Sequence, residues 1–224
     1  MISAGSALDL SWADAHVAAI IDSFYPGARG GKAVAEAIFG DFSPSGKLPV
    51  TFYQGTENLP EFTDYDMSDR TYRYTDKNVL YPFGYGLHYG TIRYENAQIS
   101  CAQCSVRDAV DVSVDVINES SYTIHESVQA YIQHEEADAY EPGYQLKGIQ
   151  TVTLQPKETK RVTISLKARD FAIITQEGEC VVRPGSYRIA IGGQQPDARS
   201  AKLTGSDVAA LVVRREGAQT PVEY

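Results

Sequence analysis

Apolar and polar residues alternate through the second half of this chain, and this alternation limits the fold more than any other feature. Successive side chains of a strand point to opposite faces of its sheet, so an apolar residue at every second position gives one buried face. The stretch "DAVDVSVDVIN" shows the pattern most clearly, with valines at positions 110, 112, 114 and 116. It therefore predicts a β-strand with one face in a core.

Further segments of this kind follow along the chain. They are "ESVQAYIQ", "KGIQTVTL", "KRVTISL", "GECVVRP" and "SYRIAIGG", and turn sequences such as "LQPKET" and "RPGS" separate them. About six or seven short strands with regular turns predict an antiparallel β-sandwich of immunoglobulin or fibronectin type over residues 91–205. The Cys…Trp…Cys marker of antibody domains is absent from the sequence. For residues 206–224 we expect a final strand or short helix and then a C-terminal tail.

Residues 1–53 have helical periodicity instead. In "SWADAHVAAIIDSFY" the apolar residues have the i, i+3, i+4, i+7 spacing of one helix face, and Ser11 is a suitable N-cap. The sequence "PGARGG" ends this helix, and "GKAVAEAIFG" predicts a second helix with Gly40 in the usual stop position. "PGARGG" could also bind an anion through free backbone N–H groups, but it matches no phosphate-binding motif, which favours a turn.

The stretch "SPSGKLPVTF" then predicts a turn and a short strand with Leu48, Val50 and Phe52 on one face. Two helices and one strand do not complete an α/β layer, because a parallel strand needs partners and covered faces. We therefore interpret residues 1–53 as the end of a larger α/β domain. The fold class expected for the chain is α+β multidomain, an incomplete α/β remnant followed by an antiparallel sandwich.

Residues 54–90 form a linking loop rich in Tyr, Asp and Pro. A loop of this length is unusual unless it is functional or packed against something. Its last ten residues, "YPFGYGLHYG", could be an aromatic platform for a sugar or a rigid joint between two parts of the protein. Glycine and proline fix a bent path, and tyrosine buries a ring while its hydroxyl stays wet, which favours the joint.

The net charge and the hydropathy exclude several partners. A formal charge of −9 without a basic stripe argues against nucleic acid, whose phosphates need clustered Lys and Arg. No apolar run approaches the roughly 20 residues of a membrane helix, so we expect no membrane partner. The first residues lack a basic segment followed by an apolar one, as in a secretory signal, and this favours a cytoplasmic location.

The three cysteines do not make a disulfide framework, because one of them must stay unpaired. Cys101 and Cys104 form a C-x-x-C pair, which is typical of zinc and redox sites. No second pair follows to complete a zinc site, and the pair precedes a strand pattern rather than a helix. We interpret them as reduced thiols at a strand edge, with a partial metal site as the alternative.

Several other polar residues are candidates for chemistry. Glu61, Asp64, Asp66 and Asp69 could pair as acid and base, but neighbours in one loop rarely reach the 5–5.5 Å geometry of a retaining glycosidase. A solvated acidic loop is favoured, with a contact at the rim of a substrate site as the alternative. The four histidines, at positions 16, 88, 125 and 134, form no ligand motif. We expect no catalytic, cofactor-binding or metal-binding residue in this chain, and no cofactor.

Taken in order, several stretches resemble the C-terminal part of glycoside hydrolase family 3, the β-glucosidases and β-xylosidases. They are "GSALDLSWAD", "YPGARGGKAVAEAIFGDFSPSGKLPVTF", "LPEFTDYDM", "RTYRY" and "LYPFGYGLHYGTIRY". In the second half, "LKGIQTVTLQPKETKRVTISL" and "RPGSYRIAIGG" resemble the fibronectin type III-like domain of the same family. The resemblance implies that residues 1–53 end an α/β-sandwich domain and that residues 91–205 form the fibronectin-like domain.

The resemblance also implies where the catalytic residues of such enzymes lie. The nucleophilic aspartate belongs to a (β/α)8 barrel with a Ser-Asp-Trp motif, and the acid/base glutamate to an upstream part of the α/β-sandwich domain. The sequence "SDR" around Asp69 lacks the tryptophan and follows the polar "TDYDM", so the nucleophile is not assigned to Asp69. Glu36 and Glu61 likewise receive no role. His88 stands where the family usually has Ser or Thr.

Two functions follow as hypotheses. In the first, this chain is the non-catalytic, stabilising C-terminal portion of an enzyme that hydrolyses terminal β-glucosides or β-xylosides with retention. Its partner would then be the barrel-containing portion or a second copy of the chain, and we expect the chain alone to be inactive. In the alternative, the chain is a fibronectin-like module that binds carbohydrate or protein.

Overall fold

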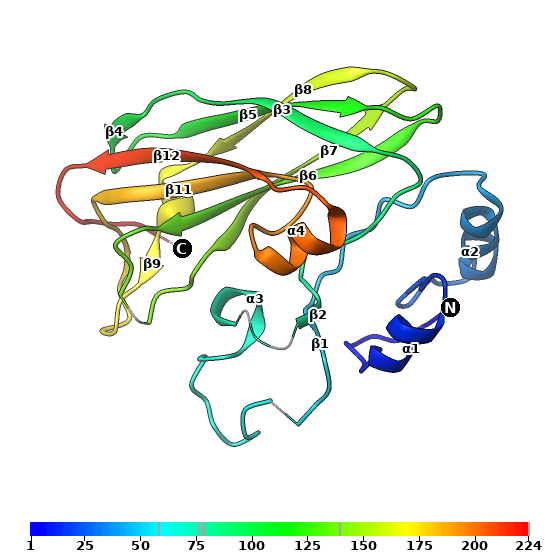
Figure 1. Cartoon of the computed structure of the whole chain (residues 1–224). Coiled ribbons are helices and arrows are strands. Elements are labelled where there is room, and N and C mark those ends of the chain that lie inside the picture. Colours follow the sequence, from blue (N-terminus) through cyan, green and yellow to red (C-terminus); the bar gives the residue numbers. More distant parts are fainter. Residues whose placement is uncertain (58, 76, 78, 139, 224) are drawn as a thin grey trace.

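The computed structural model describes residues 1–57, 59–75, 77, 79–138 and 140–223, which form a β-sandwich with an N-terminal region at one end (Figure 1). One sheet has the strand order β3-β5-β8, with β3 at Ile92–Ile99, β5 at Val110–Asn118 and β8 at Thr159–Leu166. The facing sheet has the order β4-β12-β11-β6-β7. Its strands are β4 (Gln103–Ser105), β12 (Ala209–Glu216), β11 (Gly185–Gly192), β6 (Ile124–His134) and β7 (Gln145–Leu154). Every pairing in the sandwich is antiparallel except β4 with β12, so the sandwich predicted from residue periodicity is confirmed.

The core of the sandwich lies between these two sheets. The four alternating valines of β5 are completely buried, and Tyr187, Ile189 and Ile191 of β11 contribute to the same cluster. Burial of each such side chain stabilises the fold by about 1.5–3 kcal/mol. The Tyr187 hydroxyl donates to the carbonyl of Arg183, 2.8 Å away, which resembles the tyrosine corner of immunoglobulin-like domains.

The C-terminal segment contains a final strand, one of the two elements expected there, but more of it is paired than expected for a tail. Residues 209–216 form β12, which lies between β11 and β4 in the five-stranded sheet. A small sheet of order β13-β10-β9 follows, with β13 at Thr220–Pro221, β10 at Cys180–Val182 and β9 at Ile173–Ile174. The 3₁₀ helix η1 (Ala168–Phe171) precedes β9, and α4 (Ala198–Thr204) connects β11 to β12. Residues 209–216 are therefore part of the sandwich, because β12 pairs with β11 on one side and with β4 on the other.

The first predicted helix is wrong beyond its first turns. Helix α1 covers only Ser11–His16, Leu10 occupies the N-cap position, and the Ser11 hydroxyl donates to Asp9 instead of capping the helix. Residues 20–23 are extended, because the backbone of Ile2 donates to Ile21 and accepts from Ser23. This pairing with the start of the chain uses the backbone groups that a longer helix would need.

The second helix is confirmed, whereas the predicted strand is much shorter than expected. Helix α2 covers Gly30–Phe39, and Gly40 ends it in the left-handed conformation with φ 81°. Strand β1 is limited to Phe52–Tyr53 and pairs with β2 (Val79–Tyr81). Pro49 has no N–H, and Val50 is exposed rather than on a shared buried face with Phe52. A further short helix of this region, α3, covers Thr71–Tyr74.

The N-terminal region buries little of its apolar surface. Its described core cluster contains only three buried residues, Leu10, Phe52 and Leu80, whereas six large apolar side chains between residues 12 and 65 are more than half exposed. We call these the uncovered apolar set: Trp12, Tyr25, Ile38, Phe39, Phe62 and Tyr65. Among the described residues, no helix has the length and apolar character required to cross a membrane.

Candidate functional site

The segment 81–90 is packed between the N-terminal region and the sandwich. Its backbone runs beside residues 46–48: the N–H of Leu48 donates to Tyr85 (2.8 Å), and the N–H of Gly84 donates to Leu48 (2.8 Å). A Cβ on Gly86 would lie 2.0 Å from the carbonyl oxygen of Gly46, so only glycine permits this approach. We call residues 46–48 and 79–90, with the sandwich residues that they contact, the joint.

The tyrosines of the joint are used for internal contacts. The Tyr81 ring stacks on Tyr85 with centroids 5.7 Å apart, and its hydroxyl donates to the carboxylate of Asp14 at 2.6 Å. Burial, and then the bond to Asp14, raise the pKa of Tyr81, which keeps the hydroxyl a donor. The Tyr89 hydroxyl donates to the carbonyl of Ala37 at the end of α2. These rings are therefore not an open platform for a sugar.

A second aromatic cluster fixes α3 against the sandwich. The Tyr72 ring stacks on Phe83 with centroids 4.1 Å apart, and its edge meets Tyr131 of β6. Tyr144 meets Tyr131 at a right angle, and the N–H of Leu146 donates to the Tyr72 hydroxyl. The cluster thus joins the "RTYRY" segment, the joint and the sandwich in one packed unit.

An ionic cluster lies at the centre of the joint. The carboxylate of Glu126 on β6 is only 1% exposed and lies 3.1 Å from the Lys47 amine and 3.2 Å from the His88 imidazole. Burial by itself would raise the pKa of Glu126, but the hydrogen bond from His88 and the charge of Lys47 outweigh it and lower the pKa. Glu126 therefore stays ionised. Lys47 belongs to segment 46–48 and His88 to segment 79–90, so the carboxylate contacts both segments of the joint.

One arginine adds a further link between the two parts. Asp197 caps α4 by accepting from the N–H groups of Arg199 and Ser200. The Arg199 guanidinium then donates twice to the carbonyl of Leu80, at 3.0 and 2.8 Å. This connects the helix between β11 and β12 to strand β2. Neither Glu126 nor Arg199 was a candidate in the sequence, because no local motif marks them.

The acidic residues of the linking loop are placed apart from the joint. Arg70 donates to the backbone carbonyls of Glu61, Asp64 and Asp66 and so holds the loop together. The carboxylates of Asp64 and Asp66 each accept an N–H two residues further on, and Asp69 pairs with Lys77 at 3.1 Å. These carboxylates stabilise turns in the loop.

The cysteines are all free thiols in the structure. Cys104 lies on β4 at the edge of the five-stranded sheet, and burial, then a hydrogen bond with Cys101, raise the pKa of its thiol to about 11. A thiol with a raised pKa is a poor nucleophile and metal ligand. Within the described part of the chain, no three His, Cys, Asp or Glu side chains are arranged to hold a metal ion.

The histidines other than His88 also have local partners. His16 stacks on Trp12 with ring centroids 4.8 Å apart, and His125 shares a hydrogen bond with Thr153. His134 is buried beside Glu141, 3.1 Å from its carboxylate. Ring stacking and polar contacts within the protein account for each of them.

Comparison with known proteins places both parts in one family. Residues 1–89 match the glycosyl hydrolase family 3 C-terminal domain, and residues 126–195 match a fibronectin type III-like domain. This chain is C-terminal sequence of glycoside hydrolase family 3. The first match ends at the joint, and the second covers β6 to β11 of the sandwich.

Relatives in this family are considerably longer. A β-xylosidase from Formosa agariphila is 33% identical over 89% of this chain, and a xylan 1,4-β-xylosidase from Xylanibacter ruminicola is 35% identical over 89%. The chain spans 29% and 23% of the length of these two family 3 proteins. A β-glucosidase from Erythrobacter marinus has the same fold over 96% of the chain, with a TM-score of 0.79, 32% identity and 27% of its own length covered.

Proposed function

We propose that this chain is the non-catalytic, stabilising C-terminal portion of a family 3 enzyme that hydrolyses terminal β-glucosides or β-xylosides with retention. The joint is the observation that supports this role most directly. Its tyrosines, its glycines and the ion pairs of Glu126 are used to attach the N-terminal region to the sandwich. Such a joint holds two domains in one fixed orientation.

The uncovered apolar set supports a partner for the N-terminal region. Side chains such as Phe39, Phe62 and Trp12 are 84%, 94% and 70% exposed, and exposed apolar groups of this size usually mark a contact surface. We propose that the remaining portion of the enzyme, which contains the catalytic barrel, covers them. The greater length of the relatives supports this partner over a second copy of the chain.

The alternative function, a module that binds carbohydrate through the tyrosines of residues 81–90, has less support. Tyr81 and Tyr85 stack on one another, and the hydroxyls of Tyr81 and Tyr89 make internal hydrogen bonds, which leaves little of this cluster to stack on a sugar.

An activity assay tests the proposed function. The purified chain is incubated with nitrophenyl β-glucoside and nitrophenyl β-xyloside, and we expect no hydrolysis above the rate in buffer. Hydrolysis that a single substitution abolishes, in Glu61, Asp64, Asp66 or Asp69, would disprove a purely stabilising role. The same preparation should unfold in one cooperative transition, which separates an inactive folded chain from an unfolded one.

A further inference from the structure

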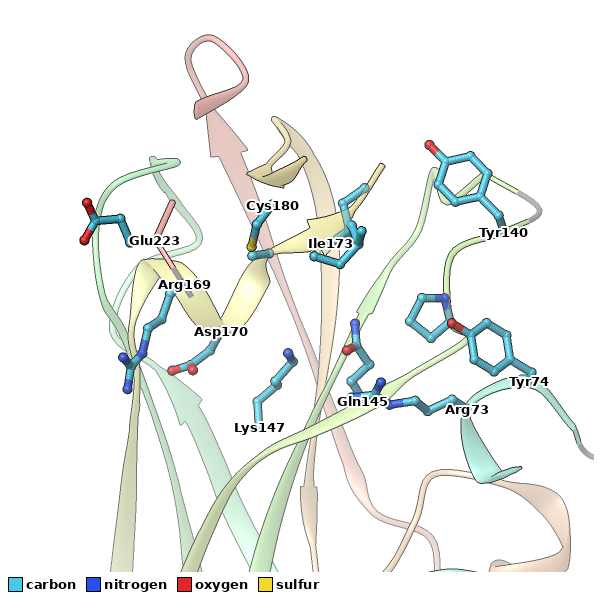
Figure 2. A pocket seen from close by; sticks show the side chains of 13 residues that line it. Arg73, Tyr74, Tyr140, Gln145, Lys147, Arg169, Asp170, Ile173, Cys180 and Glu223 are labelled. Atoms are coloured by element: carbon cyan, nitrogen blue, oxygen red, sulfur yellow. The ribbon is translucent and has the colours of Figure 1, made fainter. Parts of the chain in front are cut away.

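A pocket of about 320 Å³ lies between α3 and the sandwich, and no residue of segments 46–48 or 79–90 lines it. It is bounded by the end of α3, the start of β7, η1 and the small sheet of β9 and β10 (Figure 2). Its lining includes Arg73, Tyr74, Tyr140, Gln145 and Lys147. A volume of this size fits one or two sugar residues or another small molecule.

A bulge in β7 places the most important basic residue of this pocket. Along the pairing of β6 with β7, Ala130 is opposite Gly148 and Tyr131 is opposite Leu146. Lys147 is therefore the extra residue, with no partner on β6. A bulge redirects its side chain and bends the strand, and bulges are common beside functional sites. Here the Lys147 side chain lines the pocket.

Three basic groups line this pocket and make no ion pair in the described part of the chain: Arg73, Lys147 and Arg169. The carboxylates of Asp170 and Glu223 also line it. Most arginines of the sandwich are in ion pairs, as with Arg161 and Asp115 (2.8 Å) or Arg188 and Glu135 (2.9 Å). In a chain with a net charge of −9, a recess where three unpaired cations outnumber two carboxylates indicates a site for an external anion.

The surroundings of Lys147 agree with this interpretation. Burial, and then the charge of Arg73, lower the pKa of Lys147, and only a weaker influence of Asp170 and Cys180 opposes them. The Asp170 carboxylate already accepts the N–H of Lys167 at 2.7 Å. An anion between Lys147 and Arg73 would relieve their repulsion.

Gln145 and the two tyrosines of the lining suit a sugar ring. Figure 2 shows the Lys147 amine, the Gln145 amide and the Arg73 guanidinium gathered on the floor, with the Tyr74 and Tyr140 rings at one side. Lysine, arginine and the glutamine amide donate to the two oxygens of a carboxylate. Tyrosine offers an apolar face to a ring and a hydroxyl to its polar groups.

We propose that this pocket binds a carboxylate-bearing sugar, a hexuronate residue, with Lys147 and Arg73 on the carboxylate and the tyrosines beside the ring. The site is separate from the joint and does not depend on the proposed stabilising function. It would give the fibronectin-like domain a means of contact with acidic glycans.

Titration calorimetry with D-glucuronate, D-glucose and inorganic phosphate tests this site on the whole chain. Glucuronate should bind, glucose should not, and 0.5 M salt should weaken the binding because it screens the two cations. In Lys147→Met, which keeps the aliphatic stem, affinity should fall about tenfold or more. Lys202→Met, which removes one charge from the exposed side of α4, should leave it unchanged.

Four results would overturn the inference. They are no glucuronate binding at about 10 mM ligand, equal binding of glucose, tighter binding of phosphate than of glucuronate, and wild-type affinity in Lys147→Met. Urea unfolding of each variant shows whether its fold is intact. If Lys147→Met fails to fold, Arg73→Gln provides the same test, because Arg73 is exposed and its main-chain contact to Gly143 is retained.

Discussion

The carboxylate of Glu126 and the imidazole of His88 lie 3.2 Å apart across the joint, one on a strand of the sandwich and one on the loop that leaves the N-terminal region. Lys47 completes the cluster from a third segment. A carboxylate that is 1% exposed requires such partners, because an isolated buried charge costs several kcal/mol. The two parts of the chain are thus held together by a charge that neither part could bury alone.

We predict that Glu126→Gln destabilises the chain by about 3 kcal/mol, since it leaves the Lys47 amine without its buried counter-ion and removes the carboxylate that His88 contacts. The pKa of Glu126 is lowered in the folded state, so its contribution is fully present above about pH 4.5 and is lost as the pH falls below that value. Urea unfolding between about pH 3 and 6 measures this, and Glu126→Gln should have a flatter pH dependence than the wild type. Equal slopes for the two proteins would refute it. Glu177→Gln, on an exposed turn, is the control.

We predict that Gly86→Ala destabilises the joint by about 1–3 kcal/mol, because its Cβ would meet the backbone oxygen of Gly46 at 2.0 Å. Gly31→Ala is the matched control, because its Cβ has no neighbour within 4 Å and alanine favours the helix. Limited proteolysis should cleave Gly86→Ala faster between the two parts, whereas Gly31→Ala should match or exceed the wild type. If Gly86→Ala is as resistant to proteolysis as the wild type, the close approach of Gly86 to the backbone of Gly46 is contradicted.

Arg215 is buried and its guanidinium lies over the Phe171 ring at 4.2 Å while it donates to the carbonyls of Val106 and Asp108. We predict that Arg215→Met lowers the free energy of unfolding by about 3 kcal/mol, since both carbonyls lose a charged donor. Arg214 is the exposed neighbour of Arg215, and Arg214→Met should change the free energy of unfolding by less than about 0.5 kcal/mol. Denaturant unfolding compares the two, and equal effects would count against the buried anchor.

We predict that the uncovered apolar set makes the isolated chain associate in a concentration-dependent way. Phe39→Ser, at a side chain that is 84% exposed, should reduce this association and leave the unfolding transition unchanged. Ile149→Thr removes an exposed apolar group from the sandwich and should have no such effect. Size-exclusion chromatography with light scattering measures the mass at several concentrations. A wild-type chain that is monomeric throughout would show that these side chains need no partner.

Local sequence patterns were sufficient to predict an element where its buried residues follow the period of a strand or a helix. The valines of β5 and the glycine stop of α2 could be predicted because strand alternation and the left-handed conformation of Gly40 depend on neighbouring residues. The role of "YPFGYGLHYG" as a joint could be inferred from the glycine and tyrosine content. The partners of its residues could not, because Asp14, Ala37 and Glu126 are distant in sequence.

The sequence by itself determined the sandwich, the family resemblance and the position of the joint, since these depend on residue type at fixed spacing. Only the tertiary structure decided that residues 209–216 enter the sheet, that α1 ends at His16 and that Glu126 is buried with Lys47 and His88. The physical reason is the same in each case. Pairing between distant segments satisfies backbone groups or a buried charge, and this overrides what the local pattern favours.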